Sequence, residues 1–232
     1  MTAEYAVPAA PRPTVEVDGS ARRFPVRRIF CVARNYPEHA REMGMGGDRA
    51  PPFFFTKPAD AVVASGSAVP YPPRTGNLHH EIELVVALAA GGRNIAADAA
   101  PARVFGYAVG NDLTRRDLQL AAKGQGQPWD TAKGFDHAAP ITPIVPLARS
   151  GHPSSGRIWL EVNGSLRQQG DISDMIWSVP EVIAELSTWF ELAPGDLIFT
   201  GTPAGVGPLV PGDQVRGGVD GVGVLEHSVV AR

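Results

Sequence analysis

The sequence has one cysteine, few charged residues and no long apolar run, and each shortage excludes a class of protein. Cys31 cannot form a disulfide within the chain, so no disulfide framework holds this fold. Gly, Pro or a charged residue interrupts every apolar stretch before it reaches roughly 18 residues, the length that argues for a membrane-spanning helix. Lys and Arg are scattered and the formal net charge is −3, which argues against binding to nucleic acid or to an acidic membrane.

The N-terminal residues predict neither a targeting signal nor a core element. They lack the basic and then continuously apolar pattern of a secretory signal, so a cytoplasmic location is expected. Residues 1–13 are rich in Ala and Pro and predict a loosely held arm. We therefore divide the 232 residues into an N-terminal arm over residues 1–25 and one large domain over residues 26–232.

The pattern of apolar residues predicts a mixed α+β fold that is mainly β. Apolar residues make up 44% of a chain that also has 26 Gly and 22 Pro, as in a globular protein rich in turns and short strands. Helices are expected over residues 38–43, 115–123 and 179–190. Strands are expected over residues 26–32, 53–55, 61–64, 81–89, 105–110, 158–162, 196–200 and 222–230. The segment 44–52 is rich in Gly and Pro and is expected to form a loop that could cover a site.

Glu81 and Glu83 are two carboxylates in an otherwise apolar predicted strand. Side chains two residues apart on a strand point to the same face, so the two anions would lie side by side. Buried anions repel each other unless a positive charge separates them, and a hard cation such as Mg²⁺, Mn²⁺ or Ca²⁺ suits carboxylate oxygens. The alternative is that one of the two faces solvent from an edge strand.

Asp112 follows another predicted strand and is a third candidate metal ligand. Alone, an Asp in this position is also explained as a helix N-cap or a turn residue. Together with Glu81 and Glu83, it would complete a three-carboxylate site that leaves positions open for water and for substrate oxygens.

His39 and Glu42 lie one turn apart on a predicted helix. The carboxylate could hold one imidazole nitrogen while the other nitrogen accepts a proton from water, which describes a general base. An ordinary polar pair on a helix surface has the same spacing.

Several cations and a Gly-rich segment complete the list of candidates. Arg34, Lys57, Arg116 and Lys133 lie near these segments, and an anionic substrate beside three carboxylates needs such charges. Residues 200–207, with the sequence TGTPAGVG, allow backbone N–H groups to approach an anion closely, although a simple turn explains them equally well.

The motifs, taken together in their order along the chain, resemble those of the fumarylacetoacetate hydrolase family, in particular its acylpyruvate hydrolase branch. The resemblance covers nearly all of residues 29–230. Its motifs are CVARNY at 31–36 before His39, KP at 57–58, HEIEL at 80–84, GND at 110–112, RDLQ at 116–119, AKGFD at 132–136 and FTGTPAGVG at 199–207. Ala33 stands where the family usually has Gly.

The resemblance implies a rolled, barrel-like β-sheet with a few short helices, a homodimer, and Mg²⁺ or Mn²⁺ held by Glu81, Glu83 and Asp112. It also implies a reaction, the metal-dependent cleavage of a carbon–carbon bond in a 2,4-dioxo acid, with fumarylpyruvate of gentisate breakdown as the most specific expectation. The resemblance assigns catalysis to His39, Glu42 and Lys133, and substrate binding to Arg116, Gln119 and Thr202. We add Arg34 to the substrate-binding residues because of its position in the sequence.

Two other functions remain compatible with the same residues. One is decarboxylation or isomerisation of a 2-oxo diacid such as oxaloacetate, which uses the same chelating end of the substrate. The other is a non-catalytic metal-binding protein on the same fold, which would have no use for the His39–Glu42 pair.

Overall fold

A computed structural model describes residues 5–44 and 49–232, and short strands hold more of them than helices do. The strands are β1 (Thr14–Glu16), β2 (Arg23–Pro25), β3 (Arg28–Ala33), β4 (Phe53–Lys57), β5 (Val62–Ala64), β6 (Ala68–Pro70), β7 (Leu78–His80), β8 (Ile82–Leu88), β9 (Val104–Asn111), β10 (Thr114–Arg115), β11 (Ala139–Ile141), β12 (Val145–Pro146), β13 (Arg157–Val162), β14 (Ser165–Asp171), β15 (Asp196–Phe199), β16 (Gly207–Leu209), β17 (Gln214–Val219) and β18 (Gly223–Val230). The α-helices are α1 (Pro37–Glu42), α2 (Arg116–Gly124), α3 (Asp130–Lys133), α4 (Leu147–Ser150) and α5 (Val179–Trp189). Single 3₁₀ turns are η1 (Ala59–Ala61), η2 (Ala97–Ala99), η3 (Pro101–Arg103) and η4 (Ile172–Asp174).

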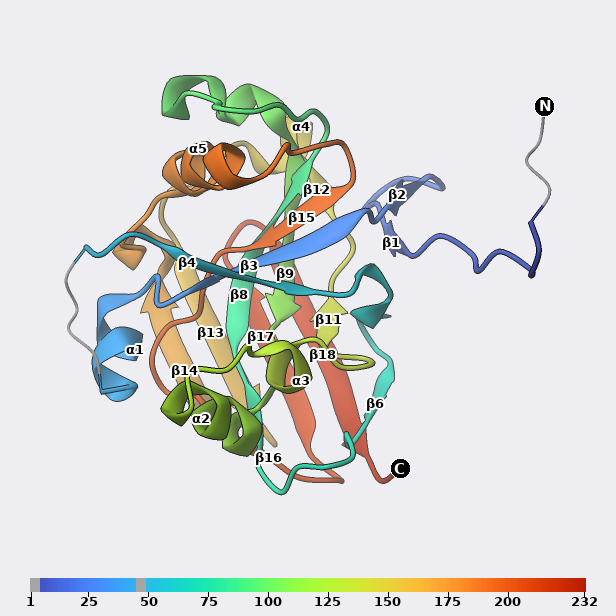
Figure 1. Cartoon of the computed structure of the whole chain (residues 1–232), viewed down its shortest axis with the longest axis vertical. Helices are drawn as coiled ribbons and strands as arrows, with labels where there is room; N and C mark the ends of the chain where they lie inside the picture. The colour runs from blue at the N-terminus through green and yellow to red at the C-terminus, as the bar shows by residue number, and fades with distance from the viewer. Residues whose placement is uncertain (1–4, 45–48) are drawn as a thin grey trace.

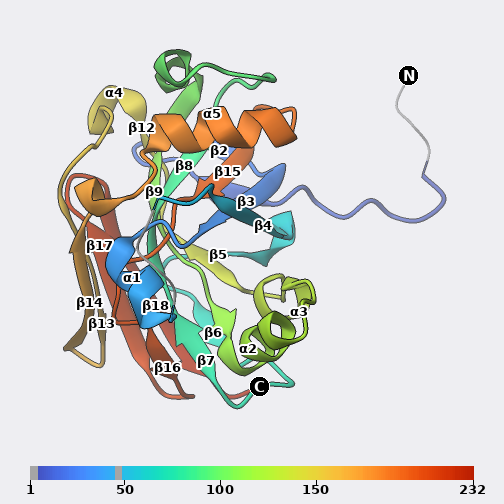
Figure 2. The same ribbon diagram turned by 60° about the vertical axis from the view of Figure 1, so that its left-hand side comes forward.

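Two large sheets form the body of the molecule (Figure 1). The larger has the strand order β4-β3-β15-β8-β9-β11-β5, with β12 paired to β9, and it curls into a half-barrel. The smaller has the order β14-β13-β17-β18-β6 and forms a second layer beside it (Figure 2). The predicted fold, mixed but mainly β with a rolled sheet and short helices, is confirmed.

The core lies between the two sheets and around strand β8. Every residue of β8 is buried, and the smaller sheet packs on one face of β8 and β9. The layers approach so closely that a Cβ atom on Gly217 would lie 2.7 Å from Ile82 Cδ1. A residue at the start of β8 is therefore held rigidly, which matters for the carboxylates there.

The helices form where the sequence carries clear signals. Ser178 and Glu181 form a capping box at the start of α5, and Val182, Ile183 and Leu186 bury one face of that helix. Pro37 occupies the first turn of α1, where its missing N–H leaves no hydrogen bond unmade. No helix in the described ranges is long and apolar enough to cross a membrane.

The N-terminal segment contains structure after residue 13. Residues 5–13 lead away from the body of the molecule (Figures 1 and 2), whereas β1 and β2 form a hairpin whose Val15 and Phe24 belong to the hydrophobic core. Residues 1–4 of the predicted arm and residues 45–48 of the predicted covering loop lie outside the described residues. The division of the chain at residue 25 stays a prediction.

Candidate active site

A cavity of about 240 Å³ brings the predicted site residues together. They come from α1, from the start of β8, from the end of β9, from α2 and α3, and from the loop after β15. Those that line the cavity are Arg34, His39, Glu81, Glu83, Asp112, Arg116, Gln119, Lys133 and Thr202. The remaining predicted residue, Glu42, contacts the cavity through His39.

Three buried carboxylates meet at the centre of this cavity. Glu81 immediately precedes β8, Glu83 is its second residue and Asp112 follows the end of β9, and β8 and β9 pair antiparallel. The side chains of Glu81, Glu83 and Asp112 each offer an oxygen within 4.8 Å of the others. Gly110, two residues before Asp112, packs against the Phe199 ring, where a Cβ atom would lie 2.4 Å from a ring carbon.

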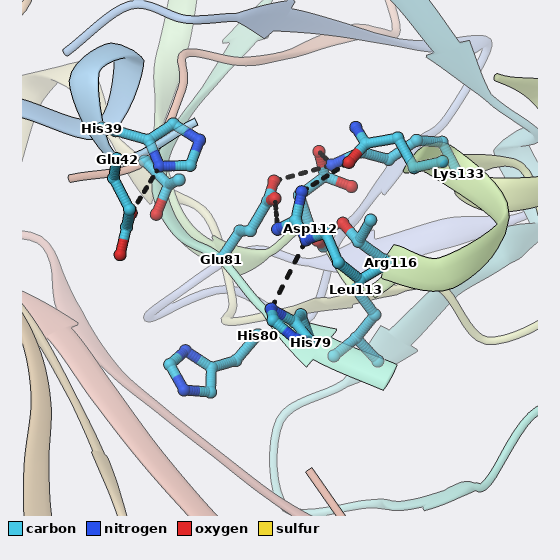
Figure 3. Close-up of polar contacts among 12 residues, drawn as sticks. His39, Glu42, His79, His80, Glu81, Asp112, Leu113, Arg116 and Lys133 are labelled. Carbon is cyan, nitrogen blue, oxygen red and sulfur yellow. Dashed lines mark hydrogen bonds and ion pairs between the residues drawn. The ribbon is translucent and has the colours of Figure 1, made fainter. Parts of the chain in front are cut away.

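Buried cations neutralise part of this charge (Figure 3). Lys133 Nζ lies 2.7 Å from both Glu81 Oε2 and Asp112 Oδ2, Lys57 Nζ lies 2.8 Å from Asp112 Oδ1, and Arg116 pairs with Glu81. Burial raises the pKa of Glu81, but the charges of Lys133 and Arg116 outweigh burial and lower it. Burial lowers the pKa of Lys133, but Asp112 and Glu81 outweigh burial and raise it.

Glu83 is the exception in this cluster. In the described part of the chain, its carboxylate is hydrogen-bonded only by the Gly201 N–H, at 2.7 Å, and it has no ion pair. Burial and then the charges of Asp112 and Glu81 hold its pKa well above the usual range. A divalent cation would relieve this cost, and the oxygen-only donor set suits Mg²⁺, Mn²⁺ or Ca²⁺.

The formal charges of the cluster leave a positive surplus when a divalent cation is bound. When all three carboxylates, Glu81, Glu83 and Asp112, are ionised, their charge equals that of the three buried cations Lys57, Lys133 and Arg116. A divalent cation adds two positive charges to a buried site. A dianionic substrate would restore neutrality, because a net charge is costly in a poorly solvated cavity.

The His39–Glu42 pair is a dyad in the structure. His39 Nδ1 lies 3.0 Å from Glu42 Oε2, and the Gly205 N–H donates to the other oxygen of Glu42. Burial raises the pKa of Glu42, but these hydrogen bonds outweigh it and lower the pKa. An ionised Glu42 only accepts hydrogen bonds, so Nδ1 carries the proton and Nε2 of the buried His39 can accept one.

Backbone N–H groups of the predicted Gly-rich segment donate hydrogen bonds to carboxylate side chains of the protein itself. Gly201 has a φ of +99° and Gly205 one of +95°, conformations that favour glycine. A Cβ atom on Gly201 would lie 2.7 Å from the Cβ of Asn35, and a Cβ atom on Gly205 would lie 2.1 Å from the carbonyl oxygen of Arg167. One loop thus donates to a candidate metal ligand, Glu83, and to the dyad residue Glu42.

Two buried amides, Gln168 and Asn111, which the sequence analysis did not assign to the site, support it. Gln168 accepts from Ile82 N–H and from His80 Nδ1, and it donates to Thr202 Oγ1 at 2.8 Å. Asn111 accepts from Glu81 N–H and donates to His227 Nε2 at 2.9 Å. No signal within the sequence identifies these pairs, because Gln168 lies 88 residues from its partner His80 and His227 lies 116 residues from its partner Asn111.

The sequence analysis did not predict the apolar wall of the cavity, which Phe53, Phe55, Trp129 and Leu120 form. Trp129 packs at a steep angle against Phe53, at 5.0 Å between ring centroids, and against Phe55, at 5.8 Å, and all three rings line the cavity. Leu120 lines it as well and is 50% exposed. The alternation of side chains along β4 places Phe53 and Phe55 on one face, the only local signal for this wall.

Comparison with known proteins decides the family. The model described as fumarylacetoacetate (FAA) hydrolase C-terminal matches residues 28–230. The chain belongs to the fumarylacetoacetate hydrolase family. A fumarylpyruvate hydrolase of a Ralstonia species is 46% identical over 177 residues, which cover 76% of this chain and 92% of the relative. A mitochondrial oxaloacetate tautomerase of Mus musculus is 44% identical over 203 residues, which cover 88% of this chain and 91% of the relative.

A solved structure extends the similarity to the fold and the cofactor. Fumarylpyruvate hydrolase of Pseudomonas aeruginosa, in complex with Mn²⁺ and pyruvate, has a TM-score of 0.96 at 49% identity and covers 99% of this chain and 100% of its own. Membership of this family and these relatives confirm the predicted class of enzyme, a hydrolase acting on carbon–carbon bonds. The predicted divalent-cation cofactor is borne out by the Mn²⁺ of that relative and by the acidic triad of this chain.

Proposed function

We propose that this family member hydrolyses a 2,4-dioxo acid between C3 and C4, with fumarylpyruvate as the substrate and fumarate and pyruvate as products, a reaction of aromatic (gentisate) catabolism. One observation carries the proposal: an oxygen-only acidic triad and a histidine–carboxylate dyad line one cavity. The fumarylpyruvate hydrolases of Ralstonia and Pseudomonas aeruginosa support the choice of substrate.

Glu81, Glu83 and Asp112 would hold the divalent cation, Mg²⁺ or Mn²⁺. When bound, the cation supplies Lewis-acid stabilisation of the negative charge that develops on the 2-oxygen of the substrate. Lys133 contacts Glu81 and Asp112 directly, lowers the pKa of Glu81 and adds positive charge beside both ligands.

His39 acts as the general base in this proposal. Its Nε2 removes a proton from a water molecule, and the oxygen attacks the 4-carbonyl carbon. The C3–C4 bond then breaks, the electron pair remains on C3 as a pyruvate enolate, and protonation of C3 gives pyruvate. The acyl carbon gains the hydroxyl group and leaves as a carboxylic acid. Glu42 holds the imidazole in the required tautomer and stabilises its positive charge.

The remaining predicted residues would bind and orient the substrate. Arg116 donates to Gln119 and pairs with Glu81, so α2 presents a fixed donor pair beside the metal site. The Thr202 hydroxyl accepts from Gln168 and is thereby held at the cavity wall. Arg34 has a φ of 61°, an uncommon conformation for a non-glycine residue, and lines the same cavity.

Product analysis tests the proposal. The purified protein is incubated with fumarylpyruvate, acetylpyruvate and oxaloacetate, each with Mn²⁺ and each with a chelator. We expect chelator-sensitive release of pyruvate together with the carboxylic acid that matches each acylpyruvate. If neither acylpyruvate is hydrolysed while Mn²⁺ is bound, the proposal is wrong.

A second candidate is isomerisation of oxaloacetate. It is favoured by the oxaloacetate tautomerases among the relatives, which reach 44% identity. The keto and enol forms differ by the position of one proton, which the His39–Glu42 dyad could transfer without any attack by water. The same incubations separate the activities: interconversion of the keto and enol forms changes the ultraviolet absorbance of oxaloacetate without release of pyruvate, and decarboxylation releases carbon dioxide.

The assembly and the location of the protein stay predictions. We propose a homodimer, as the resemblance to the family implies, and a cytoplasmic enzyme that acts on a small molecule. Sedimentation analysis of the purified chain with and without Mn²⁺ tests the homodimer.

A further inference from the structure

A row of polar side chains on α2 runs from the acidic triad to the mouth of the cavity. Arg116, Gln119 and Lys123 are spaced i, i+3 and i+7, so they share one face of the helix, and all three line the cavity. Arg116 and Gln119 are buried, and Arg116 pairs with Glu81, whereas Lys123 is exposed. At 1.5 Å per residue, Lys123 lies about 10 Å further along the helix axis than Arg116.

We propose that Lys123 binds the distal carboxylate of the acyl group and thereby selects acylpyruvates that end in a second carboxylate. This inference rests on the proposed function, because it assumes that the oxo-acid end of the substrate lies at the triad. A substrate extended along α2 would then place its other end near the Lys123 ammonium group. Fumarylpyruvate has a carboxylate at each end of an extended chain, whereas the carboxylates of oxaloacetate lie much closer together.

The present partner of Lys123 is a weak one. Its Nζ lies 3.4 Å from the Met43 carbonyl oxygen, beyond the usual range of a hydrogen bond. Met43 is the C-cap of α1, the helix that carries His39 and Glu42, so Lys123 lies close to the end of the dyad helix. A substrate carboxylate offers a charged acceptor in place of this neutral carbonyl, and such charge-assisted bonds are about twice as strong.

The space between the two ends suits a flat, unsaturated chain. Phe53, Phe55 and Trp129 line the cavity with their rings in contact, and aromatic faces pack well against planar conjugated groups. The substrate class is therefore an unsaturated dicarboxylic acylpyruvate.

Kinetics of charge variants at position 123 test the inference. In the Mn²⁺-loaded enzyme, we expect Lys123→Met to lower the ratio of kcat/KM for fumarylpyruvate to that for acetylpyruvate about tenfold, mainly through KM. Lys123→Arg keeps the charge and is expected to retain the ratio. Arg93→Met is the matched control, because Arg93 is an exposed cation that pairs with Glu191 outside the cavity. An unchanged ratio in Lys123→Met would overturn the proposal.

A chemical measurement tests the subsite without turnover. The chain has three lysines, and Lys57 and Lys133 are only 3% and 2% exposed, so acetic anhydride should acetylate Lys123 before them. We expect fumarate, added with Mn²⁺, to slow acetylation of the peptide that contains Lys123, and acetate at the same concentration to have little effect. Equal rates with both acids would contradict the subsite. If the wild-type protein hydrolyses neither acylpyruvate, the proposed function fails, and protection by fumarate then decides the subsite alone.

Discussion

Exchange of a carboxylate for its amide at Glu83 and at Asp112 tests the electrostatics of the acidic triad, because the two side chains have different partners. Asp112 pairs with the buried Lys57 and Lys133. Among the residues that the structure describes, Glu83 is bonded only by the Gly201 N–H, which can also donate to a glutamine oxygen. The same chemical change should therefore destabilise the metal-free protein much more at Asp112 than at Glu83.

The expected magnitudes follow from these contacts. In the metal-free protein, Asp112→Asn breaks buried ion pairs and should cost about 3–5 kcal/mol of unfolding free energy, or roughly 6–20 °C in Tm. Glu83→Gln removes a buried carboxylate without an ion pair and should change the unfolding free energy by less than about 1 kcal/mol. Removal of one of three ligands should weaken Mn²⁺ binding at least about 100-fold.

Thermal unfolding measured with and without Mn²⁺ distinguishes these effects. At a concentration of 100 times the wild-type Kd, Mn²⁺ stabilises the wild-type protein by about 2.7 kcal/mol, or roughly 5–10 °C. Under the same conditions Glu83→Gln should gain only about 0.4 kcal/mol, close to 1 °C. The reasoning is refuted if metal-free Glu83→Gln melts as low as Asp112→Asn, or if Mn²⁺ stabilises it as much as the wild-type protein.

Three further changes test other parts of the site. His39→Ala should lower turnover roughly 100- to 10,000-fold, because the general base is lost, and should leave the Mn²⁺-induced rise in Tm intact; full turnover would exclude His39 as the base. Gly201→Ala should destabilise the protein by about 2–3 kcal/mol in urea unfolding, since φ is +99° and the new methyl group meets Asn35; an unchanged midpoint would contradict this. Burial lowers the pKa of His227 from 6.5 to about 4 in the folded protein, so the unfolded chain binds a proton first as the pH falls. The contribution of neutral His227 to stability is therefore complete above pH 6.5 and is lost as the pH drops towards 4. Between pH 7 and 4.5 the wild-type protein should lose about 2 kcal/mol more than His227→Gln, and equal losses would refute the assignment.

The sequence predicted the elements that carry long apolar patterns. Strand β8 lies within the predicted 81–89, and α5 lies within the predicted 179–190, because its apolar residues recur at helical spacing. Strands β14 and β17 were not predicted, since β14 is mostly exposed and polar and β17 contains two glycines. Helix α3 has only four residues, too few to show a helical period.

The site was predictable where a local motif carries the chemistry. The spacing of Glu81 and Glu83 suggested a shared face, and the structure brings both to one cavity with Asp112. Which cation neutralises which carboxylate could not be predicted, because Lys57 and Asp112 are 55 residues apart in the sequence and meet only in the folded sheet. The roles assigned to these residues stay predictions until the substitutions above are made.

The loop that joins β15 to β16 has a mechanical consequence. Its Gly201 N–H holds Glu83 and its Gly205 N–H holds Glu42, four positions apart on one short piece of backbone. When this piece moves, it carries an oxygen of the acidic triad and the dyad in the same direction, so thermal motion disturbs their separation less than two independent supports would. An insertion between the two glycines would uncouple them, and chains that keep this chemistry should therefore vary in length elsewhere.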